Sequence, residues 1–143
     1  MKTHHSIDYS EAKKIVDAIV AKAQSLKKAV VISVVDSNGD PLAFARMDGA
    51  AIPSIQIAAN KAWTAARNRK PTKDIGDRIR HPQEGFDVAY YGDPRIVGWG
   101  GGIPLWKDGE LVGAIGVSGL SSEEDVELAQ VGAKAANFSN NQE

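Results

Sequence analysis

The chain has 143 residues, 43% of them apolar, which is enough for one domain over residues 1–143 with a single hydrophobic core. Its 17 basic and 18 acidic side chains give a formal net charge of −1 and are mixed along the sequence, which argues against nucleic acid or an anionic membrane as a partner. Cysteine is absent, which excludes disulfides and iron–sulfur clusters.

The sequence favours a cytoplasmic protein. No apolar run approaches the roughly 20 residues that a membrane-spanning helix needs. Residues 1–14 lack the apolar region of a secretory signal. The absence of cysteine also suits a reducing compartment, so we expect a location in the cytoplasm.

Residues 7–28 carry the signals of an amphipathic helix. Asp8 is a suitable N-cap, Glu11 follows three residues later as in a capping box, and Ile7 can form a hydrophobic staple. Apolar residues then recur at helical spacing, at Ala12, Ile15, Val16, Ile19, Ala23 and Leu26. This spacing predicts a helix with one buried face.

Two strand-like segments, residues 29–36 and 41–48, lie on either side of a turn signal. The first, AVVISVVD, is rich in valine, which favours a buried strand. Asn38-Gly39 supplies the positive φ that a tight hairpin needs. The two segments are therefore predicted to pair as antiparallel strands.

Residues 54–67 predict a second helix, and residues 72–80 predict a short helical turn. The basic end of the longer helix stops before Pro71, as the helix dipole and the proline rule require. Its expected apolar stripe is Ile55, Ala59, Ala62 and Ala66. Residues 81–94, called the excursion below, have no clean period and are typical of a segment that lines a site or contacts a partner.

Three more strand-like segments follow, at residues 95–100, 103–107 and 110–119. Asp108-Gly109 is a hairpin signal between the second and the third. The last of them alternates bulky and small side chains, so one of its faces is nearly bare. We expect a helix to pack closely on that face.

Residues 121–138 predict the last helix, with Ser121 and Glu124 as a capping pair. The elements thus come in the order α-β-β-α, excursion, β-β-β-α. Hairpins between neighbouring strands indicate a mainly antiparallel sheet of five strands with helices packed on it. The predicted fold is α+β, profilin-like or PAS-like, and not a Rossmann domain.

Residues 98–120 hold eight of the 14 glycines in the chain. A phosphate-binding loop would need its glycines between a strand and a helix, whereas these lie between strands. A flexible loop does not fit the strong strand formers around them. Gly113 and Gly116 are best explained by close packing of the last helix on the sheet.

Gly100, Gly101 and Gly102 differ because they are adjacent and directly precede Ile103 and Pro104. Such a segment can bulge and present its N–H groups to a ligand oxygen or carboxylate. A tight turn explains the triplet equally well, and both interpretations stay open. The triplet and Pro104 are our candidate contacts for a small anionic ligand.

Four segments in this order resemble the GlcG/HbpS-like haem-binding family, which also includes the carboxy-terminal domain of PduO-type proteins. They are VVDSNGDPLAFARMDGA, IAANKAWTAA, GGGIPLWKDGELVGAIGVSG and EEDVELAQVGA, and the likeness extends from residue 7 to 136. The resemblance implies a profilin-like domain that forms dimers, tetramers or octamers. It also implies haem as a cofactor, and a role in iron handling or beside glycolate or diol metabolism.

The resemblance raises the question of which residues could bind haem iron. The predicted first helix has no histidine, so an axial ligand from that position is missing. His81 in the excursion is the candidate imidazole, and Met47, Tyr90 and Tyr91 are the other axial ligand types. A solvent-facing His81 is the alternative.

Charged residues elsewhere are candidates for contacts with a small substrate. Arg46 and Asp48 come at the end of a strand, where either a pocket or a surface ion pair accounts for them. Lys61 either meets a ligand carboxylate or extends from its helix edge toward solvent. Asp125 is explained by the dipole of the last helix, and no metal site is predicted.

Our leading hypothesis is an oligomeric accessory protein that binds a small anionic ligand, with haem as the candidate cofactor, near Gly100–Gly102. Oligomers are expected because the alanine-rich helices and the tryptophans offer apolar patches. The alternative is a lyase, isomerase or hydratase acting on a small hydroxy acid or aldehyde. There the glycine N–H groups would stabilise an oxyanion, Arg46 or Lys61 would hold a carboxylate, and Asp48 or the adjacent tyrosines would move protons.

Overall fold

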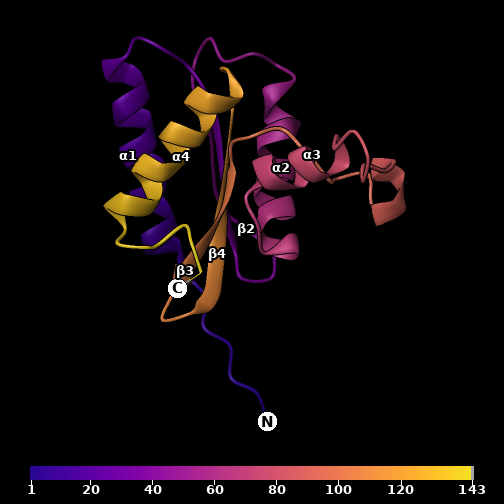
Figure 1. The fold of residues 1–143 in the computed structure, drawn as a ribbon. Helices are drawn as coiled ribbons and strands as arrows, with labels where there is room; N and C mark the ends of the chain where they lie inside the picture. The colour runs from indigo at the N-terminus through magenta and orange to yellow at the C-terminus, as the bar shows by residue number, and fades with distance from the viewer. Residues whose placement is uncertain (143) are drawn as a thin grey trace.

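A computed structural model describes residues 1–142 as a sheet with helices on both faces (Figure 1). The elements are α1 Tyr9–Ser25, β1 Val31–Asp36, β2 Pro41–Arg46, α2 Ser54–Asn68, α3 Thr72–Ile79, the 3₁₀ helix η1 Val88–Tyr91, β3 Gly102–Lys107, β4 Glu110–Ser118 and α4 Ser122–Ala135. The strands pair antiparallel in the order β2-β1-β4-β3. Helices α1 and α4 cover one face, α2 covers the other, and α3 with the excursion extends away from the body.

The sheet has four strands within residues 1–142, and the prediction of five is wrong. The expected extra strand, residues 95–100, lies outside the sheet. The Thr64 hydroxyl of α2 donates to the Arg95 carbonyl at 3.0 Å and accepts from the Val97 N–H at 3.2 Å. Because a helix side chain satisfies these backbone groups, the segment is held against α2 and does not pair as a strand. The α+β class is confirmed, whereas the profilin-like or PAS-like assignment stays a prediction.

Helix α1 begins as its sequence predicts. Asp8 Oδ1 accepts from the Glu11 N–H at 2.9 Å, and Glu11 Oε1 accepts from the Asp8 N–H at 3.0 Å, which completes the capping box. The second hairpin is also confirmed, since Asp108 and Gly109 both have positive φ, at 51° and 75°. Local signals therefore fix both features.

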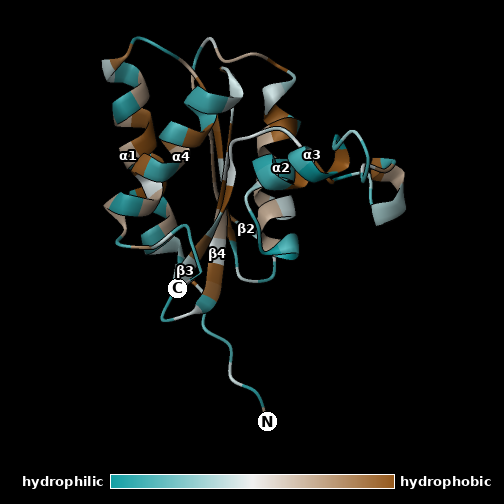
Figure 2. Ribbon diagram, viewed as in Figure 1, coloured by the Kyte–Doolittle hydropathy of each residue, from teal (hydrophilic) through white to brown (hydrophobic). Residues whose placement is uncertain are grey.

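Most of the hydrophobic core lies between the sheet and the layer formed by α1 and α4. Side chains from both helices and three strands meet there, among them Ile15, Ile19, Ile32, Val34, Ile103, Ile115, Val117 and Leu128. Figure 2 shows that the helices combine hydrophilic and hydrophobic residues, while the central strands are largely hydrophobic or neutral. The smaller core on the opposite face is built mainly from alanines of α2.

The bare face of β4 accepts α2, and the prediction that the last helix packs there is wrong. A Cβ atom on Gly116 would clash with the Ala58 carbonyl and lie 2.5 Å from the Ala62 nitrogen. The backbones of β4 and α2 are therefore too close for any side chain at this position. Helix α4 packs on the other face, where Gly132 brings it against Ile15 and Ile19 of α1.

Candidate functional site

Helix α2 carries a lysine into the protein interior. Its buried residues include Ala58, Lys61 and Ala65, whereas Ile55 and Ala59 of the predicted stripe are half-buried. Lys61 thus lies on the buried stripe, and only 2% of its side chain is exposed. The expectation of a lysine extending toward solvent is wrong. The other interpretation of Lys61, contact with a ligand carboxylate, stays a prediction.

Lys61 is bound by groups from two other elements. Its Nζ donates to the Val117 carbonyl of β4 at 2.9 Å and to Asp125 Oδ2 of α4 at 3.1 Å. Asp125 is also 2% exposed, and its Oδ1 accepts from the Leu120 N–H at 3.1 Å. An ammonium has three N–H donors, so Lys61 retains one beyond these two bonds. This buried ion pair joins α2, β4 and the start of α4.

Gly101 covers the head of Lys61. A Cβ atom at this position would clash with the Val117 carbonyl and would lie 2.8 Å from Lys61 Nζ and 3.0 Å from the Asp125 Cβ. Its φ of +128° is also one that only glycine adopts readily. The glycine is required because the backbone passes directly over the ion pair.

The neighbouring glycines are enclosed in the same way. The Gly102 N–H donates to Thr72 Oγ1 at 2.9 Å, and that hydroxyl lies 3.3 Å from the Gly102 carbonyl, to which it donates. A Cβ on Gly100 would lie 3.1 Å from Val126 Cγ2. Gly100, Gly101 and Gly102 are all buried. Their contact with a ligand, and that of the buried Pro104 in β3, stays a prediction.

A hollow of about 360 Å³ adjoins the ion pair, and we call it the Lys61 hollow. Trp99, directly before the glycines, is 57% exposed and contributes to its wall. Ser118 Oγ donates to Ser54 Oγ at 3.2 Å, and both serines are buried. The hollow is lined by Ser54, Ile57, Lys61, Trp99, Ser118, Gly119, Leu120, Ser122 and Asp125.

Burial dominates the electrostatics of the pair. It lowers the pKa of Lys61 and raises the pKa of Asp125, because the interior disfavours both charges. The mutual attraction of the two groups opposes each shift without cancelling it. The pair is therefore poised closer to proton exchange than an exposed lysine and aspartate would be.

The structure does not bring Arg46 and Asp48 into this hollow. Both line a separate hollow of about 610 Å³ at the end of β2, together with Met47, Lys27 and Lys28. Arg46 is opposite Val31 of β1, which is in turn opposite Ser118 of β4, so a strand lies between the two places. The roles predicted for Arg46 and Asp48 stay predictions.

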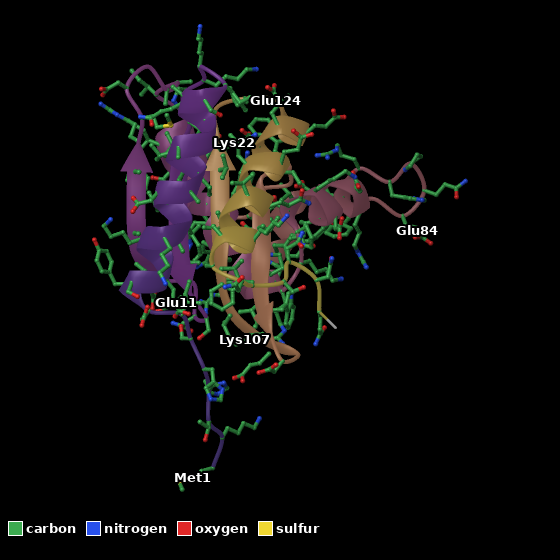
Figure 3. All side chains as sticks on the ribbon, turned by 90° about the vertical axis from the view of Figure 1, so that its left-hand side faces the viewer. Met1, Glu11, Lys22, Glu84, Lys107 and Glu124 are labelled. Atoms are coloured by element: carbon green, nitrogen blue, oxygen red, sulfur yellow. The ribbon has the colours of Figure 1, made fainter. Side chains whose placement is uncertain are left out.

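The candidate haem ligands of the excursion lie at a third place. His81 is exposed, and its Nδ1 accepts from the Gln83 and Glu84 N–H groups at 3.2 and 2.9 Å, which places the proton of the neutral ring on Nε2. In Figure 3, Glu84 marks the far end of the excursion, well away from the sheet. A hollow of about 360 Å³, the aromatic hollow, is lined here by Asn68, Lys70, Ile75, Arg78, Phe86, Tyr90 and Tyr91.

Sequence reasoning missed the role of Asp125. It was assigned to the helix dipole, but it shares a helical face with Leu128, Ala129 and Gly132, all of which are buried. A charge on a buried stripe requires a partner, and Lys61 between buried alanines shows the same signal. Two such charges on different helices predict an ion pair. Recognising this pair from the sequence requires placing Lys61 on the buried face of α2, which the predicted apolar stripe did not include.

Fold and site together define the class of protein. It is an α+β domain whose antiparallel sheet lies between helices, with a buried lysine–aspartate pair at one end of the sheet. The sequence profile of the family described as haem-degrading protein HbpS-like matches residues 7–134. The chain therefore belongs to the HbpS-like family, and the resemblance seen in its sequence is confirmed.

Individual relatives agree with this assignment. An uncharacterised 15.0 kDa protein from the dhaT–dhaS intergenic region of Citrobacter freundii is 39% identical over 125 residues, which cover 87% of this chain and 88% of that protein. The corrinoid adenosyltransferase PduO of Salmonella typhimurium is 32% identical over 96% of this chain but only 41% of PduO. The crystal structure of a PduOC–haem complex matches with a TM-score of 0.89 and 32% identity, over 96% of this chain and 99% of that one.

Two searches of residues 1–142 gave negative results. No helix in this part of the chain is long and apolar enough to cross a membrane. Nor do three or more histidine, aspartate or glutamate side chains gather there in a group that could hold a metal ion.

Proposed function

We propose that this protein is a homo-oligomeric, haem-binding accessory protein of the cytoplasm, acting in haem or iron handling or in the metabolism of small hydroxy acids or diols. The observation that carries the proposal is the haem complex of PduOC, which shares this fold over 96% of the chain. The description of the family as haem-degrading supports the same cofactor.

The chemistry of the aromatic hollow fits haem. Haem is a flat, largely apolar ring with two carboxylates, and it supplies an iron that takes an axial ligand from the protein. Phe86 and Tyr91 offer two tilted aromatic rings whose centroids lie 5.7 Å apart, and Tyr90 and Tyr91 offer phenol oxygens. Lys70 and Arg78 line the same hollow and supply positive charge for the two carboxylates. These residues would hold haem, which is then the small anionic ligand.

A tyrosine oxygen is the axial ligand that this site favours. Tyr90 is 83% exposed and belongs to the short helix η1, so its phenol is accessible to an incoming ring. His81 is the rival ligand, although it would have to move its ring proton from Nε2 to Nδ1 and give up the two backbone hydrogen bonds to Nδ1. Met47 lines the separate hollow at the end of β2 and so does not belong to this site.

Titration of the haem-free protein with haemin tests the proposal. We expect a shifted Soret band that saturates at one haem per chain. Replacing both tyrosines (Y90F with Y91F) should remove the charge-transfer band of phenolate-ligated iron, whereas H81A should leave it unchanged. A wild-type titration without a Soret shift would exclude haem binding. A wild-type complex that lacks this band, and whose Soret band changes in H81A but not in the double tyrosine variant, would assign the ligand to His81.

Exposed apolar side chains support self-association. Ile52 and Trp99 are 76% and 57% exposed, and burying such large side chains between subunits is favourable. The alanines of α2 and α4 and Trp106 are used inside the chain, so they do not supply the patches that the sequence suggested. Light scattering after size-exclusion chromatography should give a multiple of 15.2 kDa. A monomer at micromolar concentration would contradict this part of the proposal.

A further inference from the structure

We propose that Lys61 is an amine nucleophile that captures a small hydroxyaldehyde in the Lys61 hollow as an imine. The inference goes beyond haem binding and does not depend on it. The Lys61 hollow and the aromatic hollow share no lining residue. The observations that carry it are a buried amine beside a cavity, a carboxylate within reach of that amine, and a pair of buried hydroxyls in the same wall.

The first requirement is a neutral amine, and the geometry provides a route to one. Asp125 Oδ2 lies 3.1 Å from Lys61 Nζ and can take a proton from it directly. Burial lowers the pKa of Lys61 and raises that of Asp125, so both shifts favour this transfer. Glu124, the other carboxylate acting on Asp125, also raises its pKa. A lysine activated by burial is a recurrent nucleophile toward carbonyl groups.

The chemical step balances without an external reagent. The Nζ lone pair forms a bond to the carbonyl carbon, and the electrons of the C=O double bond move to oxygen, which takes the proton that nitrogen loses. The resulting hydroxyl leaves as water with a proton from Asp125, while a C=N double bond forms. The remaining nitrogen proton returns to Asp125. One amine and one aldehyde thus yield one imine and one water.

The wall of the hollow selects a neutral ligand with a hydroxyl group. The charged side chains of the wall, Lys61 and Asp125, offset each other, so the wall provides no net charge to pair with a ligand carboxylate. The Ser54 and Ser118 hydroxyls share one hydrogen bond, so one O–H donor remains for an oxygen of the ligand. The volume of about 360 Å³ and the flat Trp99 side chain suit a molecule of a few heavy atoms.

Reductive trapping of the haem-free wild-type protein tests the proposal directly. Brief exposure to glycolaldehyde and cyanoborohydride near neutral pH fixes an imine as a secondary amine, which peptide mass spectrometry locates. Lys13 and Lys73 are internal controls, because they are exposed and their pKa values are raised by Asp17 and Asp77. We expect Lys61 to be modified to a greater extent than either at every time point, because burial lowers its pKa whereas the aspartate partners raise theirs.

Matched variants separate nucleophilic capture from simple accessibility. D125N removes the group that takes and returns the protons, an effect of about 100-fold at the low end of general acid–base catalysis. It also removes the charge that raises the Lys61 pKa, so we expect a net loss of labelling smaller than about 100-fold. E123Q changes an exposed carboxylate in the same first turn of α4 and should leave labelling within about twofold because solvent screens that charge. S54A removes the O–H donor that the serine pair leaves free, so it should reduce labelling by glycolaldehyde more than labelling by acetaldehyde, which lacks the hydroxyl.

The outcomes are decisive. Preferential modification of Lys61 that is sensitive to Asp125 supports the proposal. An unmodified Lys61 in a protein whose Lys13 and Lys73 are labelled would overturn it and leave the ion pair a structural feature. Circular dichroism checks whether D125N is folded. If it is not, the distribution of label among the lysines of the wild-type protein decides the question alone. Because the protein contains no haem in this experiment, the result is independent of the haemin titration.

Discussion

Two ion pairs in this molecule show how differently the fold treats the same kind of contact. Lys61 and Asp125 are 64 residues apart and 2% exposed, so their contact exists only in the folded chain. Arg95 and Asp93 are two residues apart and 49% and 28% exposed, so their contact is local. The buried pair is costly to disrupt because its members have no water to replace a lost partner, whereas the local pair can exchange its partner for solvent.

The same contrast extends to the surrounding segments. Around Lys61, glycine backbone, a threonine hydroxyl and a strand carbonyl enclose the charge. Around the aromatic hollow, Tyr90 and the basic side chains of Lys70 and Arg78 remain open to solvent. One region is therefore suited to chemistry that needs a dry environment, and the other to a large flat ligand that brings its own apolar surface.

The largest effect that we expect comes from K61M. It leaves Asp125 buried without its cation, and loss of one partner from a buried pair costs about 3–5 kcal/mol. Urea unfolding should show this loss, and D125N in the same chain should restore part of it because the uncompensated charge is gone. K70M, at an exposed lysine of the aromatic hollow, is the matched control and should stay within about 0.5 kcal/mol of wild type. Equal stability of K61M and K70M would contradict the expected difference between losing a buried lysine and losing an exposed one.

G101A should have the next largest effect. Both Gly101 and Gly92 have positive φ, at +128° and +74°, but a Cβ at Gly101 would clash with the Val117 carbonyl while one at Gly92 would meet nothing within 4 Å. G92A thus measures backbone strain alone, about 1 kcal/mol, and G101A adds the displacement of β4 and Lys61, for about 3 kcal/mol in all. Thermal and urea unfolding of both variants would check this. Similar losses of stability in G92A and G101A would show that displacing β4 and Lys61 costs nothing beyond the backbone strain.

T72V and T64V compare two threonines that satisfy backbone groups in the two regions. T72V leaves the buried Gly102 N–H without an acceptor, which costs about 1–3 kcal/mol. T64V frees the Val97 N–H in a half-buried segment, where water can replace the hydroxyl, so we expect less than about 1 kcal/mol. Urea denaturation measures both losses. A larger loss in T64V would show that the attachment of residues 95–97 to α2 is the more important of the two.

Features set by neighbouring residues could be predicted from the sequence, and features set by distant contacts could not. The capping box of α1 and the Asp108-Gly109 hairpin depend on residues within one turn, and both are confirmed. The strand expected at 95–100 failed because Thr64, some 30 residues earlier, satisfies its backbone. The Lys61–Asp125 pair was missed for the same reason. The α+β class followed from the order of the local elements and their hairpins, and the family match over residues 7–134 agrees with it.

The smallest effect concerns Asp93 and appears in its titration. Hydrogen bonds from the Arg95 side chain and backbone lower the pKa of Asp93 from 3.8 to about 2. A carboxyl with a lowered pKa in the folded state contributes stability that is present above pH 3.8 and is lost as the pH falls toward about 2. Because the pair is exposed, this contribution is small.

R95K tests this local pair directly. Arg95 donates through Nε to Asp93 Oδ1 at 3.1 Å and through Nη2 to Oδ2 at 2.8 Å, and a lysine cannot make both contacts. The Asp93 pKa, followed by carboxyl NMR, should therefore rise toward 3.8 in R95K, while the unfolding midpoint at neutral pH changes little. R67K is the control, since Arg67 acts on Asp93 only through its charge, which lysine keeps. An Asp93 that titrates near 3.8 in the wild-type protein would show that the excursion does not hold even this local contact in solution.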